Sequence, residues 1–556
     1  MWNGQGDPLR LDYSPQLTSA GDDHRATDRT GIVELRRHGV LQARGPNRAK
    51  AGPRRSCTSS TPYPEHAVSV PDPEAATWQT TIALVRDVCV ALAGDRVRYC
   101  HYKRNAFLDL SRRGEKDLDL LIARADEDRF SAIMHRLGFK LACWPDGGLP
   151  GILDYYGYDS PTGRIVHVHA HYQLVVGDDL TMSYRIPLED AFLGAAREDG
   201  ELLVPPPELE LILLVIRLAL RHLTWDAVVT RRARLPASSR AELAFLQERV
   251  EEDQVDRLLE QWLPFVDRGT FRDCRLALAP DAGRGTGIRA GGRLVTALKP
   301  CARRSRAADV SLKVWRRGTR IGRRLTSRPA PRRQLAAGGA IVAMVGADGA
   351  GKSTAVEVLS ERLGKTFTVT RAHLGKPPKS LVTVVIRNVV RARSVFLGLL
   401  RLIGARSARS RSTERAVLAT AIARDRYLAF RRIRRIATNG GLVLCDRFPL
   451  RELKLMDGPR VQRVMDPDRW SRLTSLLAAR ERRYYRAITR PDVLIVLRVD
   501  PETAVARIDE SPEFVRARWR EIWAIDWDTV TAHVIDAGEP QHEVLSRVEA
   551  LVWSEL

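Results

Sequence analysis

The sequence has few features of a secreted or membrane-spanning protein. Its seven cysteines are odd in number and scattered over 556 residues, with no CxxC pair, which argues against a disulfide framework or a zinc knuckle. No window approaches the ~18 uninterrupted apolar residues that a membrane-spanning helix requires. The first residues show neither the basic nor the apolar region of a secretory signal. These absences predict a cytoplasmic protein with reduced thiols.

Acidic residues are fewer than basic ones, 67 against 90, and most of the difference arises in one stretch of the chain. The chain carries a net charge of +23, and between Arg284 and Arg333 sixteen Lys or Arg residues face one carboxylate, Asp309, so this stretch contributes 16 − 1 = +15. We interpret it as a solvated basic linker, with contact to nucleic acid or an anionic membrane as the alternative. Because no aromatic residues are spaced to stack on bases, we do not expect nucleic acid as a partner.

The chain is too long for one hydrophobic core, and its patterning predicts four segments. Residues 1–76 lack any helical or strand period, which predicts a disordered leader. Residues 77–280 read as an α/β unit with a helical tail, including a strand at 117–122, an alternating strand at 165–174 and an apolar helix at 208–222. The basic linker, 281–338, follows. Residues 339–556 form the last α/β domain, which opens on an apolar strand.

A complete phosphate-binding loop follows that strand. Gly346-Ala-Asp-Gly-Ala-Gly-Lys-Ser-Thr354 satisfies GxxxxGK[ST], and an amphipathic helix comes directly after it, as the motif requires. The glycines let backbone N–H groups wrap around phosphate oxygens, while Lys352 supplies a point charge and Ser353 can ligate Mg²⁺. The loop therefore predicts ATP and Mg²⁺ as cofactors. The residues expected to line the nucleotide are Gly346, Asp348, Gly349, Ala350, Gly351, Lys352, Ser353 and Thr354.

The form of the loop, with an acidic residue inside it, is similar to that of thymidylate kinase. Two Asp-Arg pairs extend the resemblance: Asp425-Arg426 on a helix, and Asp446-Arg447-Phe448 at the end of an apolar strand. The resemblance implies a three-layer P-loop domain with a parallel sheet, in which arginines bind the monophosphate of the acceptor and a later arginine-rich lid closes over ATP. The implied catalytic residues are Lys352, Asp446, Arg447, Arg516 and Arg518. The implied acceptor-binding residues are Asp425, Arg426 and Arg447, and the implied magnesium ligands are Ser353 and Asp446.

The chain departs from the thymidylate kinase pattern around the acceptor. Arg451 stands where the family has a serine, a different segment replaces the family's Arg-Glu-Pro-Gly-Gly at 371–378, and a basic insertion spans 380–415. These changes leave the phosphoryl-transfer residues in place. The expected acceptor is therefore a nucleoside monophosphate such as dTMP or a related phosphorylated small molecule.

The middle unit resembles polymerase-β-like nucleotidyltransferases in one motif. Asp117 and Asp119 stand two residues apart on a strand, so both carboxylates face one side and could hold metal ions. The later strand carries His167, His169 and His171 where that superfamily has a third carboxylate. These histidines could join the aspartates in a metal site, or they could form a hydrogen-bonded strand face. An active nucleotidyltransferase and a catalytically silent domain of the same fold both stay open.

Three functions are consistent with the residues. The first is a nucleotide kinase resembling thymidylate kinase. The second is a P-loop NTPase switch whose basic linker contacts nucleic acid or membrane. The third is a bifunctional kinase and nucleotidyltransferase. A homodimer is left open as the assembly.

Overall fold

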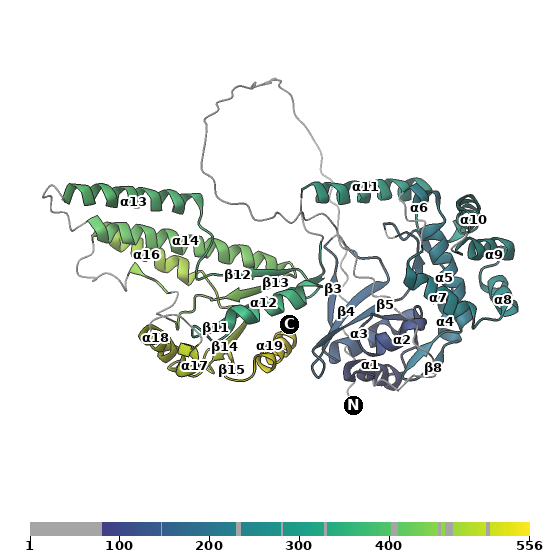
Figure 1. Cartoon of the computed structure of the whole chain (residues 1–556), viewed down its shortest axis with the longest axis horizontal. Coiled ribbons are helices and arrows are strands. Elements are labelled where there is room, and N and C mark those ends of the chain that lie inside the picture. Colours follow the sequence, from purple (N-terminus) through teal and green to yellow (C-terminus); the bar gives the residue numbers. More distant parts are fainter. Residues whose placement is uncertain are drawn as a thin grey trace, which may run out of the picture. The chain divides into compact units, whose positions relative to one another are not determined.

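The computed structural model describes residues 81–556 apart from 146, 179, 230–234, 280–281, 327–330, 402–409, 454–457, 462–470 and 507–511. The predicted leader, 1–76, lies outside the described residues. The described residues belong to one compact unit, Val68–Leu556, which contains the two expected α/β parts (Figure 1). The predicted fold class, a parallel-sheet P-loop domain preceded by a smaller α/β domain with a helical tail, is confirmed.

The N-terminal sheet is mixed, and its two faces differ in character. Among its described strands β2 (Leu118–Ile122) and β5 (Arg164–His171) run parallel, and the other neighbours are antiparallel. Along β5, Val166, Val168 and Ala170 pack against helices α1 (Ala83–Gly94) and α3 (Glu127–Arg136). The alternating histidines therefore lie on the opposite face. In spatial order the strands are β1 (Tyr99–His101), β2 (Leu118–Ile122), β5 (Arg164–His171), β4 (Ile152–Asp159), β3 (Lys140–Cys143) and β10 (Gln334–Leu335).

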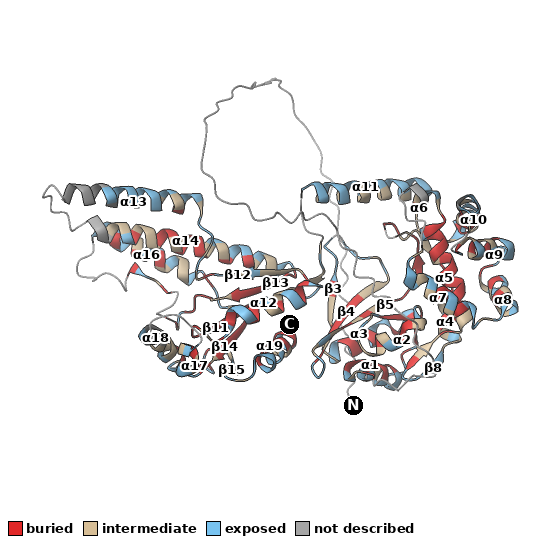
Figure 2. Ribbon diagram, in the orientation of Figure 1, coloured by how far each residue is buried: buried red, intermediate tan, exposed pale blue. Residues whose placement is uncertain are grey.

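A helical module follows the N-terminal sheet and has its own core. The expected apolar helix is α5 (Pro207–His222), which is buried along most of its length (Figure 2). It begins with Pro207 in its first turn, where the missing N–H costs no hydrogen bond. The helices around it are α7 (Ala237–Gln247), α8 (Glu252–Trp262), α9 (Arg268–Ala277) and α10 (Arg284–Ala297).

The predicted basic linker, 281–338, is mostly helical, so the expectation of a solvated linker was wrong for part of it. Helix α10 buries Ala290 and Leu294 in the core around α5, and Leu298, which follows the helix, is buried there too. Glycine makes this packing feasible, because a Cβ on Gly291 would lie 2.4 Å from the carbonyl oxygen of Leu223. Composition suggested a linker because the same small residues that permit close helix packing also occur in flexible segments.

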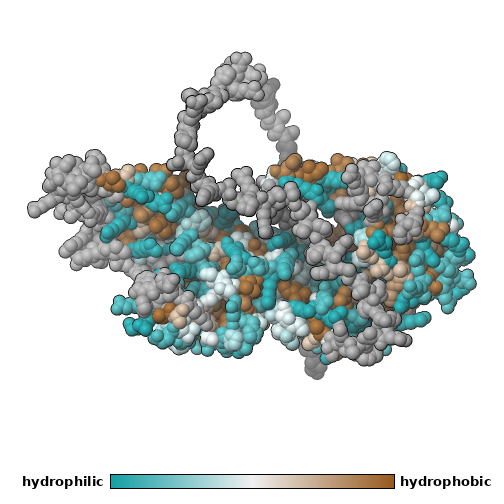
Figure 3. Space-filling view, viewed as in Figure 1, coloured by the Kyte–Doolittle hydropathy of each residue, from teal (hydrophilic) through white to brown (hydrophobic). Residues whose placement is uncertain are grey.

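Helix α11 (Arg306–Leu325) fits the basic, solvated description better. Among the described residues it buries no side chain, and its apolar residues Val314, Trp315 and Leu325 are 65%, 70% and 81% exposed. Figure 3 shows apolar side chains along α11 and along α13 (Leu381–Arg401), among hydrophilic ones. No described helix is long and apolar enough to cross a membrane.

The C-terminal sheet has five parallel strands between two layers of helices. Alternate residues of its central strand, β11 (Ile341–Gly346), face opposite sides of the sheet. Val342 and Met344 pack with α12 (Lys352–Gly364) and α19 (Gln541–Glu555). Ile341 and Ala343 pack with α14 (Ser410–Thr438) on the other side. This is the three-layer arrangement that a parallel sheet buried on both faces requires. The strand order is β12 (Val369–Ala372), β13 (Leu442–Asp446), β11 (Ile341–Gly346), β14 (Val493–Arg498) and β15 (His533–Asp536). The remaining helices of this part include α16 (Arg472–Arg486), α17 (Pro501–Ala506) and α18 (Pro512–Trp523).

Gly291→Ala tests whether α10 is a packed helix. The added methyl group must displace the backbone of Leu223, so we expect a loss of about 1–3 kcal/mol in the free energy of unfolding. Gly292 is the matched control, since nothing lies within 4 Å of its Cβ position. Gly292→Ala should stabilise the helix by up to ~1 kcal/mol. Equal effects of the two substitutions in chemical denaturation would contradict the packing of α10.

Candidate functional site

The phosphate-binding loop connects the end of β11 to the start of α12. Gly349 and Gly351 adopt φ angles of 83° and 82°, the left-handed region that favours glycine. Gly351 is the residue before the first turn of α12, so the unpaired N–H groups and the positive end of this 13-residue helix face the loop. The loop therefore has the geometry of an anion-binding site, as the motif predicts.

Lys352 and Ser353 start α12 and lie at the C-terminal edge of the sheet. The Lys352 ammonium donates a hydrogen bond to the Ala347 carbonyl oxygen at 2.6 Å. Burial lowers the pKa of Lys352 to about 8, a shift that the nearby Asp446 opposes and Arg447 reinforces. The Ser353 hydroxyl donates to Asp446 Oδ2 at 2.6 Å. The site thus holds a buried cation beside a pair of oxygen donors.

Ser353 and Asp446 suit a hard divalent cation. Asp446 Oδ1 is buried and accepts no hydrogen bond within the described part of the chain. An orphaned carboxylate oxygen beside a hydroxyl provides the oxygen donors that Mg²⁺ prefers. The predicted magnesium ligands therefore lie together and fit the ion.

Asp348 organises the cations around the loop. Its carboxylate accepts a hydrogen bond from Arg447 at 2.6 Å and forms an ion pair with Arg518 of α18. Arg447 has a φ of 67°, which is uncommon for a residue other than glycine. Backbone conformations of this kind are found most often at functional sites. Arg516, the other predicted lid residue, instead pairs with Glu502 of α17 at 3.1 Å. The structure therefore brings Arg447 and Arg518 to the loop and places Arg516 against α17.

Asp425 and Arg426 lie on α14 in a different role from the one their motif suggests. Arg426 is fully buried, and its guanidinium donates to the carbonyl oxygens of Leu374 at 2.6 Å and Gly375 at 2.9 Å. It also donates to the Tyr485 hydroxyl. Asp425 accepts from the Ser380 backbone N–H at 3.0 Å. In this conformation the pair holds the segment after β12, and contact with an acceptor phosphate stays a prediction.

In the N-terminal sheet the predicted aspartates and histidines meet on one face. His167 contacts Asp117 at 2.9 Å through Nδ1 and Asp154 at 2.8 Å through Nε2. His169 Nδ1 lies 3.2 Å from Asp119 Oδ1, and His171 Nε2 lies 3.1 Å from His169 Nδ1. The parallel pairing of β2 with β5 sets these contacts, because Asp119 and His169 are register partners. Asp117 and Asp119 therefore both contact the histidine row, and metal binding by the two aspartates stays a prediction.

Burial and fixed charges decide which forms these groups take. Burial alone would raise the pKa of Asp119, but the Lys103 ammonium at 2.8 Å and the hydrogen bond with His169 hold it well below its usual range. Burial lowers the pKa of His171 well below its ordinary value. This corner of the sheet therefore combines an anionic carboxylate with a neutral imidazole.

Three charged residues of this face were missed in the sequence. Asp154 on β4 touches two histidines, Lys103 pairs with Asp119, and Arg333 lies 3.2 Å from Asp154. The antiparallel pairing of β4 with β5 makes Asp154 the register partner of His169. The tyrosine-rich 152–159 segment is typical of a strand, but sequence alone does not give the register between two strands.

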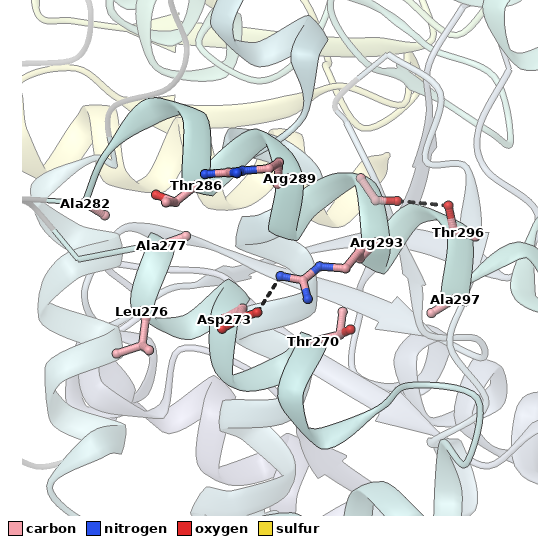
Figure 4. A pocket seen from close by; sticks show the side chains of 11 residues that line it. Thr270, Asp273, Leu276, Ala277, Ala282, Thr286, Arg289, Arg293, Thr296 and Ala297 are labelled. Carbon is pink, nitrogen blue, oxygen red and sulfur yellow. Dashed lines mark hydrogen bonds and ion pairs between the residues drawn. The ribbon is translucent and has the colours of Figure 1, made fainter.

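A cavity of about 1020 Å³ lies away from both clusters of predicted site residues. It lies between α9 and α10, where Arg293 pairs with Asp273 across a lining of small residues (Figure 4). None of the predicted site residues lines it. A smaller cavity of about 310 Å³ adjoins the histidine row, with His169 and His171 in its wall.

Comparison with known proteins gives a limited similarity. No protein-family model matches the chain. Two proteins of Escherichia coli, from strain K12 and strain O6:H1, are each 29% identical to it over 229 residues, which is 38% of this chain and 86% of theirs. Both carry the name uncharacterized ATP-binding protein YghR.

The buried Lys352 predicts a pH dependence of stability in the absence of nucleotide. Its pKa falls from 10.5 to about 8 on folding, so between these pH values the unfolded chain binds more protons and stability rises with pH. Lys352→Met should therefore stabilise the protein at pH 7, by at most about 3 kcal/mol, and the gain should vanish near pH 10.5. The measurement is the unfolding free energy of both proteins against pH. Lys365→Met, at an exposed position, should show no such trend, and a pH-independent difference at Lys352 would contradict the burial argument.

Proposed function

We propose that residues 339–556 bind ATP with Mg²⁺ and transfer its γ-phosphate to a phosphorylated small-molecule acceptor, as a nucleotide kinase similar to thymidylate kinase does. The observation that carries the proposal is the loop from Gly346 to Thr354, with its two left-handed glycines, opening onto α12 beside Asp446. The similarity to proteins named as ATP-binding supports the nucleotide part.

The donor side follows from the charges around the loop. Backbone N–H groups and Lys352 offer positive charge to the β- and γ-phosphates, and the paired oxygens of Ser353 and Asp446 would hold Mg²⁺. When bound, the ion would neutralise charge that develops on the transferred phosphoryl group. Phosphates would also offset the cost of burying the Lys352 ammonium, which Asp446 offsets only in part.

Transfer to an acceptor, rather than hydrolysis, is supported by the two arginines on Asp348. A second dianion cannot approach the ATP phosphates unless fixed cations offset the repulsion. Arg447 and Arg518 are held at the loop by one carboxylate, so their guanidiniums are oriented before either substrate arrives. A switch NTPase needs a water-positioning residue in this place instead.

The proposed acceptor is a nucleoside monophosphate such as dTMP, or a related phosphorylated compound. The buried Arg426 would act through the segment 374–375, which it holds by two carbonyl hydrogen bonds. That segment lies where the sequence departs from the thymidylate kinase pattern, so we propose that it sets the choice of acceptor.

Lys352→Ala should abolish phosphoryl transfer at saturating ATP, because the cation that balances the transferred phosphate is lost. The assay incubates the full chain with ATP and Mg²⁺ and, in turn, nucleoside monophosphates and sugar phosphates, and detects the new phosphorylated product by mass spectrometry. Lys365→Ala is the matched surface control and should keep wild-type turnover. If the Lys352 variant turned over like the wild type, the phosphate loop would not be the active site.

Arg447→Ala should raise the KM for the acceptor far more than that for ATP. Loss of one charge-assisted contact in a dry site costs ~2–4 kcal/mol, which corresponds to a factor on the order of 30 to 1,000 in KM. The exposed Arg432 on α14 is the control, and Arg432→Ala should leave both constants within about threefold. Steady-state kinetics with both substrates varied measure the effect, and equal changes in the two constants would contradict a role in acceptor binding.

A further inference from the structure

The face of the N-terminal sheet that carries the histidines lies outside the proposed kinase site and has a chemistry of its own. We propose that Asp119, His169 and His171 bind one divalent transition-metal ion of the zinc class, with an open coordination position toward the adjoining 310 Å³ cavity.

The spacing of the donor atoms matches a common ion. Metal–ligand bonds of about 2.0–2.1 Å place tetrahedral ligands roughly 3.3 Å apart. Asp119 Oδ1 lies 3.2 Å from His169 Nδ1, which lies 3.1 Å from His171 Nε2. All three donor atoms lie within 4.8 Å of one another. One ion can therefore contact all three with little movement of the side chains.

The donor types select the metal. Two imidazole nitrogens and one carboxylate oxygen favour zinc and its neighbours over Mg²⁺, which prefers oxygen alone. The site would thus differ from the all-carboxylate metal site that the Asp117–Asp119 motif suggested. Asp117 itself is engaged elsewhere, by His167 Nδ1 at 2.9 Å.

A carboxylate lies beside the other ring nitrogen of one proposed histidine ligand. Metal-binding histidines usually give their other ring N–H to a carboxylate. His169 Nε2 lies 3.8 Å from Asp154 Oδ1, and Asp154 is fixed by His167 at 2.8 Å and by Arg333 at 3.2 Å. Asp154 Oδ1 therefore lies on the Nε2 side of the His169 ring, at a distance longer than a hydrogen bond, while Nδ1 faces Asp119.

The cavity gives the ion an accessible side and suggests an anionic ligand. His169 and His171 line the cavity together with Lys103, Arg104 and Lys116. Arg217, also in its wall, is offset by Glu242 at 3.0 Å. An open metal position facing an excess of cations suits a ligand that carries phosphate or a similar anion.

Lys103 competes with the ion for Asp119. Its ammonium lies 2.8 Å from Asp119 Oδ1, the same oxygen that would bind the metal. Metal binding must move this ammonium to the second carboxylate oxygen or into the cavity. Removing the charge should consequently strengthen metal binding.

Titration of the metal-free full chain with Zn²⁺ in a calorimeter tests the site by measuring the affinity and the number of ions bound. The wild type should bind one Zn²⁺ per chain that survives the Lys352→Ala substitution. Asp119→Asn, His169→Gln and His171→Asn should each weaken binding by about 100-fold or more. Lys103→Met should tighten it. The exposed His542→Gln is the matched control and should stay within about threefold of the wild type. Absence of zinc binding by the wild type, or unchanged affinity in the three ligand variants, would overturn the proposal.

Loading the wild-type chain with Co²⁺ in place of Zn²⁺ tests the same metal site without any ligand variant, so the test stands even if a variant fails to fold. Co²⁺ bound to the wild-type chain should show the strong visible absorption of a four- or five-coordinate nitrogen-containing site, and added inorganic phosphate should change the bands. Weak absorption of an octahedral, all-oxygen site would overturn the proposal. So would bands that are unaffected by phosphate, since the ion would then have no open position toward the cavity.

Discussion

The parallel pairing of β11 with β13 is the constraint on which the candidate kinase site depends. Met344 and Asp446 are register partners, so the phosphate loop that leaves β11 starts beside the carboxylate that ends β13. The first turn of α12 then places the Ser353 hydroxyl 2.6 Å from Asp446. A slip of one residue would turn every side chain of a strand to the opposite face, which would bury apolar residues in the site and expose the core.

Two carboxylates position the polar and charged side chains at this edge of the sheet. Asp446 faces the start of α12, and Asp348 collects Arg447 from the end of β13 and Arg518 from α18. Without bound phosphates Asp348 offsets one of the two positive charges, which lowers the repulsion between Arg447 and Arg518 and leaves a net charge of about +1 for an anion. Phosphates that enter the loop can take over these partners with little movement, because the guanidiniums already point at the site.

Local motifs predicted much of this arrangement and long-range contacts did not. The phosphate loop and Asp446 were predictable because a strand, a glycine turn and a helix are adjacent in sequence. Arg518 meets Asp348 across 170 residues, and no local pattern shows which lid arginine does so. Arg426, predicted at the acceptor phosphate, also binds two loop carbonyls that no local pattern indicates. Helix α10 was mistaken for linker because its glycines pack against Leu223 rather than bend the chain.

The central claim concerns the fate of the ATP γ-phosphate, and labelling that phosphate tests it most directly. With γ-³²P-labelled ATP, Mg²⁺ and the acceptor found by screening, the account predicts that the label moves to the acceptor and that little inorganic phosphate forms. Release of the label as inorganic phosphate, at a rate that does not depend on any acceptor, would contradict the claim and indicate an NTPase.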